Sequence, residues 1–110
     1  MVGSKSNKAL DAVGAGGGVS EVYNIQRARD EVGLFFVDVS GSSIDLSVRI
    51  QGRPDATAAW FNIQSIVEGD LSATTNGGTV AVVVALFPQM RVNCNKLTGT
   101  TPVLSAWLVE

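Results

Sequence analysis

Residues 44–51, IDLSVRIQ, alternate between apolar and polar side chains at every position. In an extended strand the apolar members share one face, namely Ile44, Leu46, Val48 and Ile50. A strand with one apolar and one polar face is typical of an antiparallel sheet that covers a core on one side. A helix is excluded for this segment, because helical geometry would spread the four apolar residues around its circumference.

Other short segments with strand character follow from residue 20 onward, at 21–26, 33–40, 58–65, 78–87, 89–95 and 102–110. Turn-forming residues separate them at 41–43, 52–55, 76–78 and 98–102. Short strands at this spacing, with no convincing helix between them, indicate two packed antiparallel sheets. The sequence therefore predicts an all-β fold, an antiparallel β-sandwich that is jelly-roll-like.

The last two segments form a hairpin-like pair in this prediction, joined by the turn at 98–102. In the first of them Met90, Val92 and Cys94 would share the core face. In the second, both faces are apolar: Leu104, Ala106 and Leu108 lie on one, and Val103, Trp107 and Val109 on the other. We therefore expect this strand to be central in the sandwich or to be covered outside by another chain.

Residues 1–19 differ from the rest, and we predict a Gly-rich, extended N-terminal arm followed by a sandwich domain at 20–110. Residues 5–13 could form one or two helical turns with Leu10 and Val13 on one face. The glycines at 14 and 16–18 would then act as a flexible hinge, because glycine disfavours a helix by about 1 kcal/mol relative to alanine. Such an arm could latch onto a neighbouring subunit.

The composition argues against several classes of partner. Only 16% of the residues are charged, which is low for a free monomer, where about a quarter is usual. This composition is typical either of a surface partly covered by other chains or of a compact β-domain rich in Ser, Thr and Asn. The net charge of −2 gives no basic field for nucleic acid. The longest apolar run, 80–87, is far shorter than the ~20 residues of a membrane span. A single cysteine and no visible secretory signal suggest synthesis in a reducing cytoplasm.

The chain contains no histidine, so the common nucleophile–histidine arrangements and the commonest metal ligand are missing. Cys94 alternates with core residues and is expected to be a small buried hydrophobe. The acidic pair Glu68 and Asp70 is more typical of a solvated loop than of a calcium site or a catalytic dyad. We therefore expect no catalytic residue, no cofactor and no metal.

Six residues are candidates for contact with other chains. Arg27 and Arg29 would lie on one face of a strand. Adjacent Trp60 and Phe61 would point to opposite faces, so one of them lies outside the core of its own sheet. Trp60 and Trp107 have two interpretations, as core and interface residues or as a stacking platform for sugar rings. With Leu10 and Val13 from the arm, these residues form the predicted interface.

Residues 34–110 resemble small virion proteins of tailed bacteriophages, in particular capsid decoration (cement) proteins. The matching features are residues 48–52 (VRIQG), the Trp-containing segment 58–63 (AAWFNI), residues 88–92 (PQMRV) and the Thr-Gly-Thr turn at 98–100. The resemblance implies a jelly-roll-like domain that trimerises at three-fold positions of a capsid. A long Gly-rich arm is not part of that pattern.

Together these features predict a capsid decoration protein, made in the host cytoplasm and located on the outer surface of a phage head. Its partners would be the major capsid protein and other copies of itself, as a homotrimer, with no nucleic acid or membrane. The alternative is a carbohydrate- or receptor-binding module of a phage fibre or tail. An enzyme is not expected.

Overall fold

The computed structural model describes residues 6–25 and 31–110, and every strand pair in these ranges is antiparallel. The strands are β1 (Ser6–Val13), β2 (Gly18–Val19), β3 (Tyr23–Asn24), β4 (Val32–Arg53), β5 (Phe61–Val67), β6 (Gly78–Ala85) and β7 (Gln89–Val109). Two one-turn 3-10 helices, η1 (Glu68–Asp70) and η2 (Thr74–Asn76), link β5 to β6. The predicted all-β, antiparallel, sandwich-like fold is confirmed.

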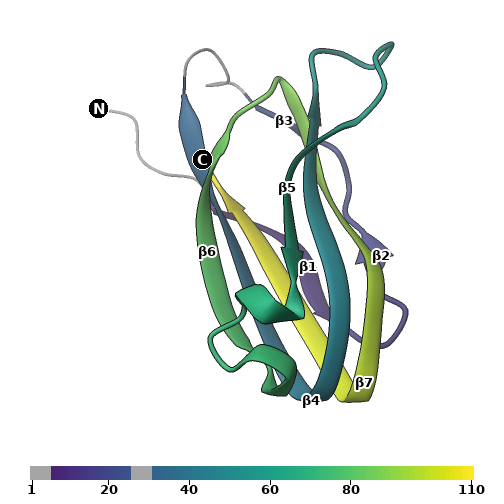
Figure 1. Ribbon diagram of the computed structural model, residues 1–110. Helices are drawn as coiled ribbons and strands as arrows, with labels where there is room; N and C mark the ends of the chain where they lie inside the picture. The colour runs from purple at the N-terminus through teal and green to yellow at the C-terminus, as the bar shows by residue number, and fades with distance from the viewer. Residues whose placement is uncertain (1–5, 26–30) are drawn as a thin grey trace.

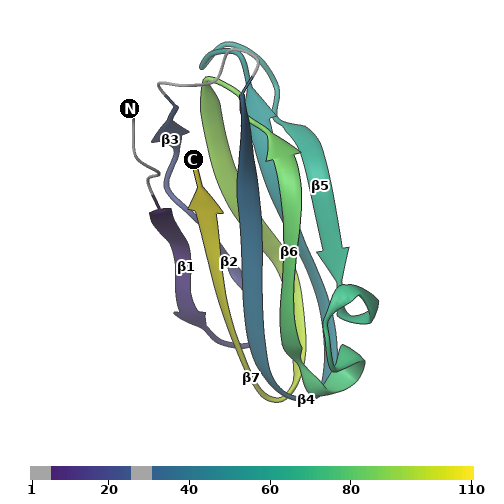
Figure 2. The ribbon, with the colours of Figure 1, turned by 90° about the vertical axis from the view of Figure 1, so that its left-hand side faces the viewer.

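Two long strands, β4 and β7, form the frame of the molecule. They pair along almost their whole length, from Leu34 opposite Val109 to Arg53 opposite Gln89. The register shifts near residue 42 of β4, opposite residue 100 of β7, and at this level both strands turn back on themselves. Figures 1 and 2 show the bend at the lower end of the molecule. One two-stranded ribbon therefore supplies the middle of both layers of the sandwich.

The remaining strands complete each layer at the edges of this ribbon. In the first layer, β6 pairs with the first half of β4 (32–39), and β1 pairs with the second half of β7 (104–109). In the second layer, β5 pairs with the second half of β4 (47–52), while β2 and β3 pair with the first half of β7 (89–94). The first layer thus has the order β1–β7–β4–β6, and the second has β2/β3–β7–β4–β5 (Figure 2).

The core lies between the two layers and uses the inward faces that alternation predicts. Ile44, Leu46, Val48 and Ile50 are all at most 2% exposed. The inward members of β7 are buried as well, namely Met90, Val92, Cys94, Leu104, Ala106 and Leu108. All of them belong to one hydrophobic cluster with Phe35 and Val37 from the other half of β4. At about 25 cal/mol per Å² of apolar surface removed from water, this cluster is the main source of stability.

The predicted hairpin-like pair at the end of the chain is wrong. Residues 89–95 and 102–109 are continuous parts of β7 and lie in opposite layers, and 33–40 and 44–51 are related in the same way within β4. Gly41 and Gly99 lie at the bend with φ of 127° and 139°. A Cβ on Gly99 would lie 2.8 Å from the Ser42 carbonyl oxygen, so the ribbon folds back here because glycine lets its two backbones approach closely.

Residues 6–13 form strand β1, so the predicted helical turns are wrong over this range. The open edge of β7 supplies backbone hydrogen-bond partners for β1, and Leu10 enters the core opposite Ala106. The glycines that follow form a tight turn, in which the Gly17 N–H donates to the Gly14 carbonyl at 3.1 Å. Residues 6–19 of the segment expected to form an arm are therefore paired with the sandwich of their own chain.

Candidate binding surfaces

The outer faces of the two layers are the candidate functional surfaces. No pocket is found in the part of the chain that the structure describes, and no group of three His, Cys, Asp or Glu residues there could hold a metal ion. Across 6–25 and 31–110, no helix is long and apolar enough to cross a membrane.

The outer face of the first layer is apolar over three neighbouring strands. Cross-strand pairing places Trp107 beside Phe36 and Phe36 beside Ala81, and the next row places Val109 beside Leu34 and Leu34 beside Val83. We call this surface the apolar face, and its members are Val32, Leu34, Phe36, Ala81, Val83, Trp107 and Val109. Val83 is 68% exposed and Val32 63% exposed. Leu34, Phe36, Trp107 and Val109 are partly exposed. Contiguous apolar residues that are open to solvent mark interaction surfaces on soluble proteins.

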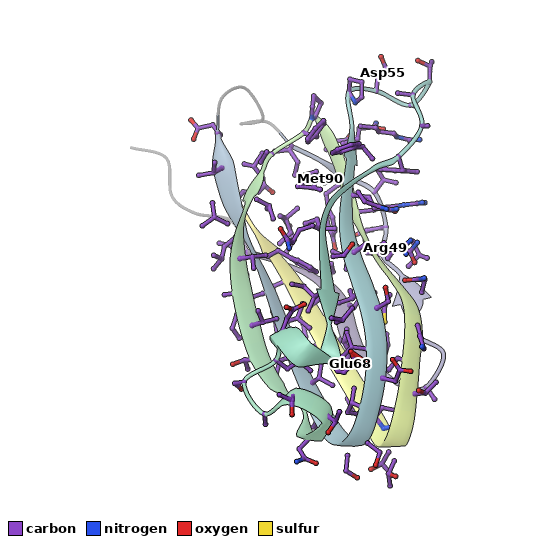
Figure 3. All side chains as sticks on the ribbon, in the orientation of Figure 1. Arg49, Asp55, Glu68 and Met90 are labelled. Atoms are coloured by element: carbon purple, nitrogen blue, oxygen red, sulfur yellow. The ribbon has the colours of Figure 1, made fainter. Side chains whose placement is uncertain are left out.

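The outer face of the second layer carries three arginines. Arg49 and Arg53 lie on either side of Gln51 along β4, and β7 places Arg91 directly opposite Gln51. Their neighbours in sequence point into the core, so these side chains point away from it; Figure 3 shows Arg49 directed outward and Met90 between the layers. With Trp60, which precedes β5, these residues form the surface that we call the arginine face.

Amide side chains order this face through a hydrogen-bond network. Arg91 Nε donates to Gln51 Oε1 at 2.8 Å, and Gln51 Nε2 donates to Asn62 Oδ1 at 2.7 Å. Farther along the sheet, Arg53 Nε donates to Gln89 Oε1 at 2.9 Å. Gln51 is only 7% exposed, so the centre of the network is buried beneath the arginines and both of its amide atoms are satisfied.

The indole ring of Trp60 packs on two of the arginines. The Arg53 guanidinium carbon lies 4.1 Å from the ring centroid and that of Arg91 lies 4.5 Å from it. Both distances are within the range of cation–π attraction. Trp60 is partly exposed. Guanidinium groups that are held both by an amide and by a ring lose less freedom when they bind a ligand.

Lys96 and Asp45 form an ion pair toward the bend of the second layer, with Nζ and Oδ2 2.7 Å apart. The Lys96 hydrogen bond lowers the pKa of the Asp45 carboxyl, and the same bond raises the pKa of Lys96. At the opposite end, the Thr57 hydroxyl and amide donate to Asp55 and lower its pKa. Figure 3 shows Asp55 in the loop between β4 and β5, and Glu68 at the far end of β5.

The structure separates the residues predicted from the sequence to form one interface. Leu10 is 4% exposed within its own core, and Val13 packs partly buried against the same cluster. Trp107 lies on the apolar face, whereas Trp60 lies on the arginine face of the other layer. Arg27 and Arg29 lie outside the described residues.

Cys94 is a buried core residue, in agreement with the prediction. Burial raises the pKa of its thiol, because the thiolate would be poorly solvated there. Only the thiolate is a strong nucleophile, so this environment does not suit catalysis.

The grouping of Arg49, Arg53 and Arg91 was not predicted. Strand alternation alone places each of them on an outward face. The β4–β7 register then brings Arg91 of β7 close to Arg49 and Arg53 of β4. A search for outward arginines on strands that could pair would have found them as candidates.

Comparisons with known proteins agree with the fold. No protein-family model matches the chain, and no curated protein matches it. Among solved structures, the SPBc2 prophage-derived protein YomS is similar with a TM-score of 0.57 and 16% identity, over 98% of this chain and 94% of that one. A mutant of a carbohydrate binding module of family 29 aligns with a TM-score of 0.43 and 14% identity, over 97% of this chain and 91% of that one. The likeness to YomS is one of fold: the two chains share a β-architecture over nearly their whole length.

Proposed function

We propose that this protein is a structural component of a bacteriophage particle, a capsid decoration protein that attaches to the outside of the head. The observation that carries the proposal is the apolar face, in which Phe36 lies between Trp107 and Ala81, and Leu34 lies between Val109 and Val83, across three strands. Burial of such a surface against another protein releases about 25 cal/mol for each Å². The prophage origin of YomS, which shares the fold, favours a phage protein.

In this proposal the role is mechanical and not enzymatic. The major capsid protein would cover part of the apolar face, and other copies of the chain would cover the rest, as a homotrimer. Val83 lies on the edge strand β6, and Val32 lies beside β6 on β4. A neighbouring chain can approach an edge strand from its outer face and from its open side. A rigid two-layer body suits a protein that bridges subunits, because little conformational freedom is lost on attachment.

The experiment compares two substitutions of the same chemistry on opposite layers. Val83→Lys places a charge in the apolar face, and Val19→Lys places one on an equally open strand of the second layer, where the side chain is 54% exposed. Sedimentation velocity at micromolar concentration gives the oligomeric state. Co-sedimentation with empty heads of the phage whose genome carries the sequence gives attachment.

We expect the wild-type chain and Val19→Lys to sediment as trimers and to bind the heads, and Val83→Lys to do neither. A wild-type chain that sediments as a monomer and leaves the heads bare would overturn the assignment. Head binding that survives Val83→Lys would show that a different surface makes the contact.

The arginine face favours a second candidate function, a carbohydrate-binding module of a phage fibre or tail. A partly exposed tryptophan beside hydrogen-bonding side chains is the type of surface on which sugar rings stack. Trp60 and the exposed Asn62, which Gln51 holds through a hydrogen bond, supply these groups on one open sheet.

A further inference from the structure

The three arginines of the arginine face form no ion pair within the part of the chain that the structure describes, although the charge of Arg53 acts on nearby Asp55. The ion pairs of the described residues join Lys8 to Asp11 and Lys96 to Asp45, and none includes Arg49, Arg53 or Arg91. Three positive charges thus lie around Gln51 on one sheet face of a chain whose net charge is −2. Such local concentration of one sign attracts an anionic ligand even when the whole protein is acidic.

The hydrogen bonds that hold these side chains leave their ligand-binding atoms free. Arg91 and Arg53 each donate through Nε to a neutral amide oxygen, of Gln51 and Gln89 respectively. Their terminal nitrogens remain available for a planar oxyanion, and a neutral acceptor does not cancel the charge. Arginine binds carboxylate and phosphate through paired donors of this kind.

The rest of the face suits hydroxyl groups. Asn62 and Asn24 accept hydrogen bonds through Oδ1 from Gln51 and Gln89, and both residues are exposed, so their NH₂ groups face solvent. The Trp60 ring is partly exposed, and the Arg53 and Arg91 guanidinium groups lie over it, so the uncovered part of the ring is an apolar surface beside the charges. A surface that combines amide groups, one aromatic plane and unpaired guanidinium groups matches a sugar polymer that also carries acid groups.

We propose that the arginine face binds an acidic polysaccharide, through carboxylate or phosphate groups held by Arg49, Arg53 and Arg91 and a sugar ring placed against Trp60. This inference rests on the second candidate function, carbohydrate binding. Nucleic acid fits less well, because single-strand binding uses a basic groove with successive aromatic platforms, whereas this face is a flat sheet with one tryptophan.

The test is isothermal titration calorimetry of the full chain with polymers that differ in one property. Polygalacturonate and its fully methyl-esterified form share a backbone and differ in the carboxylate charge. Wall teichoic acid presents phosphate in place of carboxylate, and poly-glutamate presents carboxylate without sugar. We expect binding to polygalacturonate, to teichoic acid or to both, and weak or no binding to the ester and to poly-glutamate.

Two matched variants locate the site. Arg49→Gln removes a guanidinium that makes no ion pair, and Lys8→Gln removes a positive charge from the other layer. Loss of one charged hydrogen bond corresponds to about tenfold weaker binding, which we expect for Arg49→Gln, while Lys8→Gln stays within about twofold of the wild type. Circular dichroism of each variant confirms that the fold is intact.

The possible failures are distinct. Equal binding of polygalacturonate and its ester would overturn the requirement for acid groups and leave carbohydrate binding in place. Poly-glutamate binding as strong as that of the acidic glycans would overturn the glycan and leave a general anion site. No binding to any of the polymers would overturn both this inference and the second candidate function, without bearing on the Val83→Lys comparison.

Discussion

Trp107 and Phe36 meet edge to face on the apolar face, with their ring centroids 5.4 Å apart and the rings inclined by 64°. They are cross-strand neighbours in β7 and β4. From the other side, β1 places Lys8 Nζ 5.2 Å from the centre of the indole ring. One aromatic side chain thus contacts residues of both strands that flank its own, and the rest of its surface is partly exposed.

Replacement of Trp107 by alanine is therefore expected to weaken both the fold and the association. Loss of the aromatic pair alone lowers the free energy of unfolding by about 0.5–1.5 kcal/mol. Chemical denaturation measures this change, and sedimentation velocity measures the loss of the proposed trimer. Trp60→Ala is the control, since it removes the same side chain from the arginine face and should leave the trimer intact. Loss of trimer in Trp60→Ala alone would assign the interface to the other layer.

Neighbouring residues of β7 should differ sharply in their cost of truncation. Leu104 is fully buried between the layers, whereas Val103 points outward and is 39% exposed. Leu104→Ala should lower the free energy of unfolding by about 2–5 kcal/mol, because it leaves a cavity in the core. Val103→Ala should cost well under about 1 kcal/mol. Similar costs at both positions would show that the outward face of β7 is covered in solution.

The alternating pattern was sufficient to predict the core but not the path of the chain. Ile44, Leu46 and Val48 are buried as predicted, because alternation depends only on the geometry of one strand. The alternating pattern did not predict the bend of the ribbon. A glycine such as Gly41 or Gly99 is expected in a hairpin turn and also where two paired strands bend back together, so it does not tell the two apart. Only the pairing of distant residues distinguishes the two.

The arginine face shows the same limit for a candidate site. Arg49 and Arg91 are far apart in the sequence, and each alone resembles an ordinary solvated residue. The β4–β7 register places Arg91 opposite Gln51, which lies two residues from Arg49 on β4. Register depends on contacts between strands, so a site assembled across strands becomes visible only once the pairing is known.

Two glycines in the turn between β1 and β2 have similar backbone angles, but replacing them by alanine should cost different amounts of stability. Gly16 and Gly17 have φ of 95° and 74°, which side chains other than glycine rarely adopt. A Cβ on Gly16 would meet nothing within 4 Å, while one on Gly17 would lie 2.2 Å from the Cys94 carbonyl oxygen. Gly16→Ala should cost about 1–2 kcal/mol, and Gly17→Ala clearly more, by chemical denaturation. Equal costs would mean that the turn moves away from β7 without penalty.

The thiol of Cys94 should be unreactive in the native protein. It is 1% exposed, and burial raises its pKa, so little thiolate forms near neutral pH. A chromogenic disulfide reagent should therefore label it only as fast as the fold opens, and at once in denaturant. Gly17→Ala should accelerate the labelling, because the turn that it strains covers the sulfur. Rapid labelling of the native wild-type chain would contradict the buried position.

The Asp45–Lys96 pair should contribute to stability only between two limits of pH. The hydrogen bond from Lys96, and to a smaller extent the one with Glu68, lowers the pKa of Asp45 below its ordinary value of 3.8. The contribution of ionised Asp45 to the free energy of unfolding is therefore present above pH 3.8 and is lost as the pH falls through the lowered pKa. The pKa of Lys96 is raised above 10.5, so its contribution is present below that value and is lost as the pH rises through the raised pKa. Both groups are exposed, so the effect is small and weakens with added salt. A double-mutant cycle of Asp45→Asn and Lys96→Met, followed by denaturant midpoints, should show coupling at about pH 7 that declines as the pH is lowered below the ordinary Asp45 pKa of 3.8. Coupling that persists in acid would mean that the two side chains interact through packing and not through charge.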